Sequence, residues 1–496
     1  MDRLILNGRI CDGSGSEPAA MDLLLKAGRI AEIAPPGTFA AVEAEKIDAS
    51  GRIVAPGFID AHSHGDLRKM RYRERKTLLL QGVTTEVCGN CGSSAGCVPG
   101  EYENFKWQNF AEYTAIIDSL NSPVNPVCLA GHNSIRRHVM GNCSGRASNA
   151  DLRAMRQLLE AAFAGGAAGW SSGLTYFPGK FADTAELQAL SQVTAGSEKI
   201  YATHMRSEGD DIFNAADEAA AVANAGSKRL QISHLKTIFP RNYHKLDKLL
   251  ETLERYRQEL VLYADRYPYI YSSTRIGQIL PAPYDGLVDI TEKLRASTAF
   301  GDEVAAALKH SPRDLATTIL ISRNMTLAEI AAEKGISLET AAMELLRESA
   351  EQEAAYLCMS AENLQRILAL PYVCAGSDGI ADLLDDPAGG GHPRAVGTFP
   401  KFYRMVSQQL STGEAVRKMT GLPATVFRIP ERGFIRKNYI ADLVIFDEKL
   451  LDSAADFGRE KLFPAGISKV LVNGEIAWDA AVPEKIGGGG RFIAVN

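Results

Sequence analysis

The chain has 496 residues, with 54 Lys and Arg against 60 Asp and Glu, so its formal net charge is −6. Hydrophobic residues make up 46% and charged residues 23%, which is typical of a globular protein and excludes a disordered chain. The charge balance does not favour nucleic acid as a partner, and no apolar run is long enough to predict a membrane span. The N-terminus lacks the apolar core of a signal peptide, and the eight cysteines are irregularly spaced, so we expect a cytoplasmic protein.

Short strand patterns separated by turns occupy both ends of the chain. DLLLKAGRIAEIA near the N-terminus and ISKVLVNGEIAWD near the C-terminus each combine β-favouring residues with Gly or Asp. The final stretch, GGGGRFIAVN, has the same pattern. Because chain termini often lie close together, we expect residues 1–54 and 420–496 to form one small β-sandwich domain.

The middle of the chain, residues 55–419, alternates between apolar runs of strand length and stretches with helical periodicity. The apolar runs, the first of which begins just before this region, are Ile53–Asp60, Val83–Cys88, Val124–Ala130, Gly166–Ser172, Ile200–His204, Leu230–Ser233, Leu260–Asp265 and Tyr372–Gly376. Eight strands with intervening helices predict an α/β fold, a (β/α)8 TIM-like barrel, with a doubly wound open sheet as the alternative. The long interval before the last strand contains MTLAEIAAEKG and SLETAAMELLRES, so we expect a helical insertion at about 285–365 that acts as a lid.

Six side chains that can bind a metal ion lie at or just past the C-terminal ends of predicted strands: His62, His64, Cys91, His204, His234 and Asp378. In a (β/α)8 barrel this end carries the active site. Residues two apart on a strand point to the same side, so His62 and His64 can reach the same ion. Imidazole, thiolate and carboxylate ligands together favour zinc.

The sequence around these residues resembles a known family. FIDAHSHGD, followed later by strand-end His, His and GSD, is similar to the amidohydrolase superfamily. GNCG, THMRSEG, SHLK, DRYPY, GSDG and GHPRAVGTFP, in this order, resemble N-acyl-D-amino-acid deacylases (D-aminoacylases), and the resemblance covers nearly the whole chain. It implies zinc-dependent hydrolysis of the amide bond of a small-molecule N-acyl-D-amino acid, releasing a carboxylate and a free D-amino acid.

The resemblance also implies a set of metal ligands. Many amidohydrolases bridge two metals with a carboxylated lysine at the end of strand four, but here that strand, AAGWSSGLTY, has no lysine at its end. In D-aminoacylases a strand-two cysteine fills this role, and Cys91 matches it, with Cys88 as the rival thiol. The family pattern implies a tight zinc site formed by Cys91, His204 and His234. It implies a second, weaker site formed by His62, His64 and Asp378, for which the Cys91 thiolate is a further candidate ligand.

Asp378 is the residue that we expect to act as general base. A carboxylate beside a metal-activated water can take its proton and later deliver it to the leaving nitrogen. The resemblance further implies that Lys236 and Arg394 bind the α-carboxylate of the substrate, and that Tyr267 and Ser273 supply hydroxyl contacts.

Two questions stay open at this level. Arg275, in YSSTRIG, either pairs with an acidic side chain of N-acyl-D-aspartate or D-glutamate or is solvated on the surface. A cyclic amidohydrolase such as a hydantoinase or dihydroorotase is the alternative enzyme, although such enzymes usually need the strand-four lysine. A catalytically inactive scaffold is the remaining alternative, but this chain retains every candidate ligand.

Overall fold

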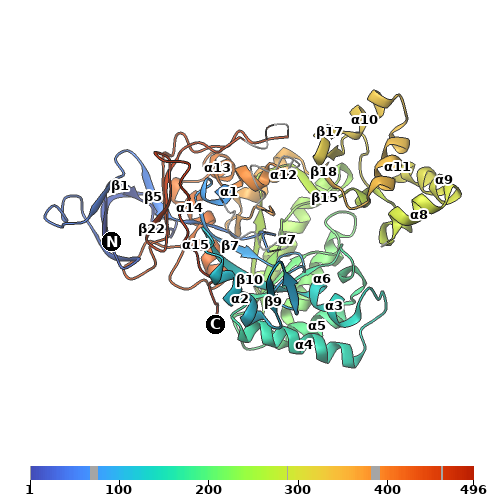
Figure 1. Cartoon of the computed structure of the whole chain (residues 1–496), viewed down its shortest axis with the longest axis horizontal. Coiled ribbons are helices and arrows are strands. Elements are labelled where there is room, and N and C mark those ends of the chain that lie inside the picture. The colour runs from blue at the N-terminus through green and yellow to red at the C-terminus, as the bar shows by residue number, and fades with distance from the viewer. Residues whose placement is uncertain (1, 67–75, 288, 381–390, 458, 460–461) are drawn as a thin grey trace.

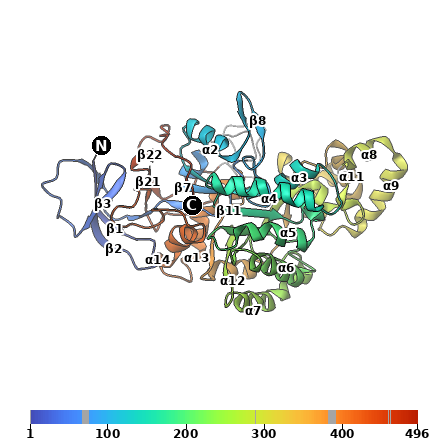
Figure 2. The ribbon, with the colours of Figure 1, turned by 90° about the horizontal axis from the view of Figure 1, so that it is seen from below.

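The computed structural model describes the chain except for residues 1, 67–75, 288, 381–390, 458 and 460–461. Three parts follow one another along the long axis in Figure 1: a β-sheet at one end, a barrel in the centre and a largely helical region at the other end. The turned view in Figure 2 shows the same order, with the terminal sheet and the helical region at opposite ends of the molecule.

The barrel consists of eight parallel strands that pair in sequence order. They are β6 (Phe58–Asp60), β7 (Val83–Cys88), β10 (Asn125–Gly131), β11 (Gly169–Gly173), β12 (Ile200–His204), β13 (Arg229–Ile232), β14 (Val261–Arg266) and β19 (Val373–Ala375). The last strand returns to the first, because Ala61 N donates to Ala375 O at 3.2 Å and His64 N donates to Gly379 O at 2.9 Å. The predicted (β/α)8 barrel is therefore confirmed, and the open-sheet alternative is wrong.

Helices cover the outside of the barrel: α1 (Lys76–Leu79), α2 (Phe110–Ser119), α3 (His132–Met140), α4 (Asn149–Ala164), α5 (Thr184–Ser191), α6 (Ile212–Asn224), α7 (Leu246–Tyr256), α12 (Ala361–Ala369), α13 (Arg394–Val406) and α14 (Thr412–Met419). In α4, a capping box between Ser148 and Asp151 starts the helix, and Met155 and Leu159 form its buried face. Every residue of β7 and of β10 is buried, as expected for strands enclosed on both faces. No helix in the described part of the chain is long and apolar enough to cross a membrane.

The C-terminus closes the end of the barrel opposite the strand ends that carry the candidate ligands. Side chains inside the barrel pack against α15 (Gly421–Val426) and against Ile493 and Val495. The prediction of a strand in GGGGRFIAVN is wrong, because these residues form no regular element. Ile493 N instead donates to Pro126 O at 2.9 Å, near the start of β10, so the segment follows the rim of the barrel.

Strands from both termini form one sheet: β1 (Arg3–Ile10), β2 (Ala19–Lys26), β3 (Arg29–Ala34), β4 (Glu45–Asp48), β5 (Ile53–Pro56), β20 (Leu443–Phe446), β21 (Ile467–Val472) and β22 (Glu475–Asp479). The antiparallel pair β5–β20 joins the two halves, which confirms a small β domain built from both ends. Ile53–Asp60 is not a single barrel strand, because the chain divides at Gly57. A Cβ on Gly57 would lie 2.2 Å from the Thr84 side chain, so glycine permits this close passage. The bounds 1–54 with 420–496 and 55–419 stay a prediction.

The segment between β14 and β19 forms a region with its own hydrophobic core. It contains α8 (Ile290–Ala296), α9 (Thr298–Ala307), α10 (Leu327–Lys334) and α11 (Leu338–Glu348), so the two predicted helical patterns are confirmed as α10 and α11. The region also contains a sheet that the sequence did not predict, formed by β15 (Tyr271–Arg275), β16 (Ile319–Leu320), β17 (Met325–Thr326) and β18 (Glu353–Leu357).

Candidate metal centre and active site

The structure brings the six candidate metal ligands together at the C-terminal end of the barrel. His204 is the last residue of β12, and the other five follow β6, β7, β13 and β19. They form two groups in which the ligand atoms lie within 4.8 Å of one another: His62, His64, Cys91 and Asp378, and Cys91, His204 and His234. Cys91 belongs to both groups, so a thiol stands where two sites meet.

Cys91 Sγ is surrounded by imidazole nitrogens. It lies 3.4 Å from His62 Nε2, 3.7 Å from His204 Nδ1 and 3.5 Å from His234 Nε2. Burial raises the pKa of this thiol, but the charges of His62 and His234 outweigh that effect and hold the pKa well below its ordinary value. The thiolate, which is the form that binds metals, is thus favoured. The rival Cys88 lies in the hydrophobic core and belongs to neither group.

The loop after β7 explains why Cys91 points into the barrel mouth. Gly89, Cys91 and Gly92 all have positive φ, at 80°, 51° and 77°. Two of these positions are glycines, for which that backbone conformation costs little, whereas Cys91 is strained. Asp66 holds the loop, because its Oδ1 accepts a hydrogen bond from Gly89 N at 3.3 Å. Ser171 adds a second anchor by donating to Gly89 O.

Each of the three imidazoles around Cys91 has a polar partner on its other nitrogen. The pairs are His62 Nδ1 with Asp265 Oδ1 at 3.1 Å, His234 Nδ1 with Glu208 Oε1 at 2.9 Å, and His204 Nε2 with Thr175 Oγ1 at 3.1 Å. Such partners orient metal-binding histidines and are a recurrent feature of metal sites. Sequence reasoning missed all three. Asp265 is the second-to-last residue of β14 and could have been found by the strand-end pattern, whereas Glu208 and Thr175 lie in loops that carry no such signal.

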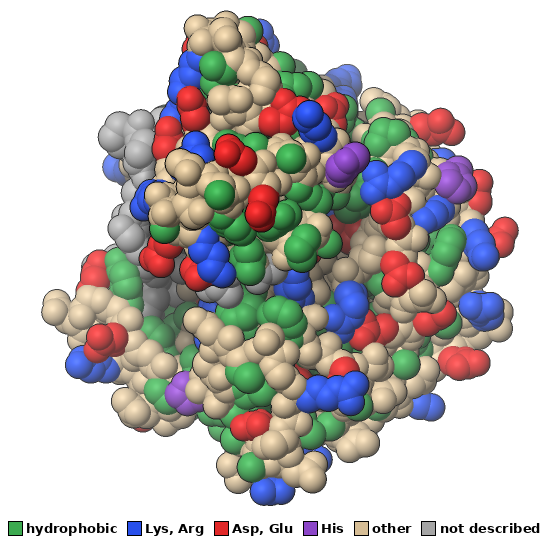
Figure 3. Space-filling view, turned by 90° about the vertical axis from the view of Figure 1, so that its right-hand side faces the viewer, with side chains coloured by type: hydrophobic (Ala, Val, Ile, Leu, Met, Phe, Trp, Pro, Cys, Tyr) green, Lys and Arg blue, Asp and Glu red, His purple; other side chains and the backbone are tan. Residues whose placement is uncertain are grey.

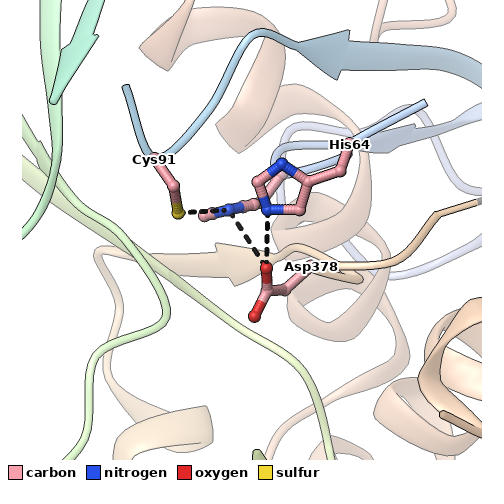
Figure 4. Close-up of side chains that lie close together, drawn as sticks. His64, Cys91 and Asp378 are labelled. Atoms are coloured by element: carbon pink, nitrogen blue, oxygen red, sulfur yellow. Dashed lines mark hydrogen bonds and ion pairs between the residues drawn. The ribbon is translucent and has the colours of Figure 1, made fainter. Parts of the chain in front are cut away.

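Asp378 lies between two histidines, His62 and His64, on one side and Arg394 on the other. Its Oδ1 is 2.9 Å from His64 Nε2 and 3.4 Å from His62 Nε2, and its Oδ2 is 2.7 Å from Arg394 Nη1. Burial raises the pKa of this carboxyl, but the charges of Arg394 and the histidines hold it well below its ordinary value. Figure 4 shows His64, Cys91 and Asp378 converging from three separate segments.

Two adjoining cavities open over the centre. The larger, of about 1200 Å³, is lined by His64, Cys91, Asp378 and Arg394 and by residues of the helical region. Figure 3 looks at the side of the molecule that carries this region, and the surface is hollowed there. The smaller, of about 280 Å³, which we call the side cavity, is lined by His204, His234, Lys236, Tyr267, Ser273 and Asp378, among others.

The four predicted substrate contacts surround these cavities. Lys236 is buried, and its Nζ lies 2.5 Å from Glu208 Oε1, so its ammonium already has an anionic partner. Tyr267 is wholly buried, with the Arg394 guanidinium 4.8 Å from its ring centre. Ser273 lies on β15 and lines both cavities. Arg394 is the first residue of α13 and holds Asp378.

Arg275 does not reach the metal centre. Its side chain is 61% exposed and lies 2.8 Å from Glu351 Oε2, at the rim of the larger cavity.

Comparison with known proteins identifies the family. The sequence profile of a family described as "Amidohydrolase family" matches residues 45–265 and 326–477 of this chain. The chain belongs to the amidohydrolase family. A D-aminoacylase of Alcaligenes xylosoxydans xylosoxydans is 32% identical to this chain, and the match covers 96% of this chain and 94% of the relative. An N-acyl-D-glutamate deacylase of the same organism is also 32% identical, and that match covers 97% of this chain and 95% of the relative. An N-acyl-D-glutamate deacylase from Bordetella bronchiseptica, solved with zinc and a phosphonate inhibitor, superposes with a TM-score of 0.84 at 31% identity, covering 100% of this chain and 99% of that one.

These matches confirm the resemblance to the D-aminoacylase family, so the chain is a metal-dependent amidohydrolase of that family. The two curated relatives have the same identity to this chain but are named for different substrates. Overall similarity therefore does not indicate which amino-acid side chain this amidohydrolase prefers. The family match also omits residues 266–325, which contain the first half of the helical region.

Proposed function

We propose that this amidohydrolase is a zinc-dependent N-acyl-D-amino-acid deacylase, which hydrolyses a linear amide to a carboxylate and a free D-amino acid. The observation that carries the proposal is the position of the Cys91 thiolate, shared between both ligand groups. β11 ends without a lysine, and the next lysine along the chain, Lys180, has its Nζ 3.4 Å from Asp285 Oδ2. A cysteine in place of the bridging lysine favours a D-aminoacylase over a cyclic amidohydrolase.

The residues present fit zinc. Cys91, His204 and His234 would form the tight site, and a second, weaker site would use His62, His64 and Asp378 together with the Cys91 thiolate. Thiolate sulfur, imidazole nitrogen and carboxylate oxygen are the ligands that zinc takes in proteins. The partners on the outer imidazole nitrogens are already in place, which fits a metal centre better than a purely structural cluster. Zinc bound there would supply Lewis acidity, which polarises a carbonyl and lowers the pKa of water.

Asp378 would move the proton. Its carboxylate is held ionised by Arg394, so it can accept a proton from the attacking water. As the C–N bond breaks, the same carboxyl would give that proton to the amide nitrogen, which then leaves as a neutral amine. Without this transfer the nitrogen would have to leave as an amide anion, which is a very poor leaving group.

The free α-carboxylate of the substrate would be held by Lys236, Tyr267, Ser273 and Arg394. The first three line the side cavity, and Arg394 lines the larger one beside it. An arginine has five N–H donors, so Arg394 can bind a substrate carboxylate while it keeps Asp378.

The test combines elemental analysis with kinetics on matched substrates. Purified protein should contain zinc, and kcat/KM for an N-acetyl-D-amino acid should exceed that for its L-enantiomer by at least roughly 100-fold, about 2.7 kcal/mol. Equal rates on the two enantiomers, or activity confined to hydantoins and dihydroorotate, would contradict the proposal.

A further inference from the structure

Arg313 is a cation in the side cavity, and its terminal N–H groups have no carboxylate partner among the residues that the structure describes. It lies between α9 and β16 and lines this cavity together with His204, His234 and Asp378. Its Nε donates to Gln278 O at 3.3 Å, and its guanidinium carbon lies 4.2 Å from the ring centre of Tyr356. These contacts hold the guanidinium in place. Within the described residues, no acidic side chain forms an ion pair with Arg313.

The other described Lys, Arg, Asp and Glu side chains around the side cavity, except Asp211, form ion pairs. The ion pairs are Lys236 with Glu208, Arg206 with Glu218, Asp210 with Arg241, Asp285 with Lys180, and Asp378 with Arg394. Asp211 accepts a hydrogen bond from Asn214 at 2.6 Å and is exposed. Among the described residues that line this cavity, Arg313 is thus the cation left without a counter-charge, and an anion placed beside it would be attracted.

The amino-acid half of the substrate is the part that enters the side cavity. Three of the four proposed α-carboxylate contacts, Lys236, Tyr267 and Ser273, line it. The metal centre lies where both cavities meet, since Asp378 lines each of them. A substrate whose scissile amide faces Asp378 would therefore extend its acyl group into the larger cavity and its amino-acid side chain past these contacts, toward Arg313.

We infer that Arg313 selects a D-amino acid with an acidic side chain, so that the preferred substrate is an N-acyl dicarboxylic D-amino acid of the aspartate or glutamate type. This inference rests on the proposed deacylase function. A guanidinium binds a carboxylate with two parallel, charge-assisted hydrogen bonds, which a neutral side chain cannot replace. Arg275, the candidate suggested by the sequence, is already paired with Glu351. Arg313 also lies in the segment 266–325 that the family match omits, where substrate preference can vary without changing the metal centre.

The experiment compares substrates of the same shape and different charge. We would measure kcat/KM for N-acetyl-D-glutamate, N-acetyl-D-aspartate and N-acetyl-D-glutamine with the wild type, Arg313→Gln, Arg313→Lys and the control Arg275→Gln. The wild type should prefer an acidic substrate over N-acetyl-D-glutamine by roughly 10- to 100-fold, the range expected for a charge-assisted pair. Arg313→Gln should abolish that preference with little change toward N-acetyl-D-glutamine. Arg313→Lys should keep part of it, and Arg275→Gln should keep all of it.

Three results would overturn the inference. An equal loss on acidic and neutral substrates in Arg313→Gln would mean that Arg313 binds the common α-carboxylate or supports the fold. An unchanged preference would mean that it contacts no substrate. A dependence on Arg313 that appears with N-succinyl-D-leucine but not with N-acetyl-D-glutamate would place it on the acyl side.

Equilibrium binding separates this inference from the deacylase proposal. Calorimetry with zinc-loaded protein would compare free D-glutamate with D-glutamine, which requires no turnover. A preference for D-glutamate that disappears in Arg313→Gln supports the role of Arg313 even if no N-acyl-D-amino acid is hydrolysed. Equal binding of the two amino acids by the wild type would overturn it, whether or not the protein is a deacylase.

Discussion

Glu208 allows a quantitative test of the electrostatics behind the metal centre. Its Oε1 lies 2.5 Å from Lys236 Nζ and 2.9 Å from His234 Nδ1, and the side chains of Glu208 and Lys236 are 8% and 3% exposed. Burial raises the pKa of this carboxyl, but the charge of Lys236, followed by those of the histidines, holds it well below its ordinary value. A carboxyl with a lowered folded-state pKa stabilises the protein at neutral pH, and this stabilisation is lost as the pH falls through that pKa.

Replacing Glu208 by glutamine should destabilise the metal-free protein by about 3–5 kcal/mol at pH 7, the usual cost of leaving one buried charge unpaired. The unpaired charge would be the ammonium of Lys236, whose Nζ lies 2.8 Å from His234 Nδ1. Replacing Lys236 by methionine as well should restore most of that stability, because the buried ammonium that had lost its partner is then removed. Zinc affinity should nevertheless stay about 10- to 100-fold below that of the wild type in both variants, since His234 has lost its carboxylate partner.

The assay is urea unfolding of the metal-free proteins, combined with zinc competition against a chelator. Glu351→Gln is the matched control, because it removes a carboxylate whose ion pair with Arg275 is exposed, and it should cost less than about 1 kcal/mol. An unfolding midpoint of Glu208→Gln equal to that of the wild type would refute the reasoning. So would a double variant as unstable as the single one, because the cost would then not come from the unpaired lysine.

Three further predictions follow from the same geometry. Cys91→Ala should lose zinc and activity together. Asp378→Asn should keep zinc in elemental analysis, but its kcat should fall by roughly 10²- to 10⁴-fold. Full activity of the Asp378→Asn variant would exclude Asp378 as the base. Burial of Lys418 lowers its pKa to about 7, so the folded state should lose stability as the pH falls from about 10 toward 7. Lys418→Met should then raise the melting temperature at pH 7 and lose this advantage near pH 10; an advantage that does not vary with pH would contradict this prediction. Deleting part of residues 302–348 should reduce turnover more than zinc content, and unchanged kinetics would count against a lid.

The convergence of the candidate ligands could be predicted because it depends on topology alone. In a parallel barrel every strand ends at the same face, so His62 and Asp378 meet although 315 residues separate them along the chain. The same rule covers Asp265, which lies near the C-terminal end of β14. The division at Gly57 was not predictable in this way. Ile53–Asp60 is one apolar run, and its two halves separate because β20, far along the chain, pairs with the first half.

Glu208, Thr175 and Arg313 belong to a different class of residue. They lie in loops or in the helical region, where the direction of a side chain depends on the local path of the backbone rather than on a strand period. The role of Arg313 follows only from its surroundings. Among the described residues that line the side cavity, five ion pairs involve the other Lys, Arg, Asp and Glu side chains except the exposed Asp211, and Arg313 is the cation without such a partner. A sequence contains the charges, but only the structure shows which of them have partners.

Hydrogen bonds within the barrel hold the backbone of three candidate ligands in a strained conformation. Cys91, His234 and Asp378 have φ values of 51°, 38° and 49°, a region in which a non-glycine residue costs about 1–3 kcal/mol. The scaffold opposes this cost with short hydrogen bonds: Asp378 N donates to His62 O at 2.7 Å, and His234 N donates to Asp265 Oδ1 at 2.9 Å. Because these bonds join strand ends to one another, the ligands are positioned by folding. Zinc would then bind a preorganised site, and the free energy of binding would not be reduced by the cost of arranging three strained residues.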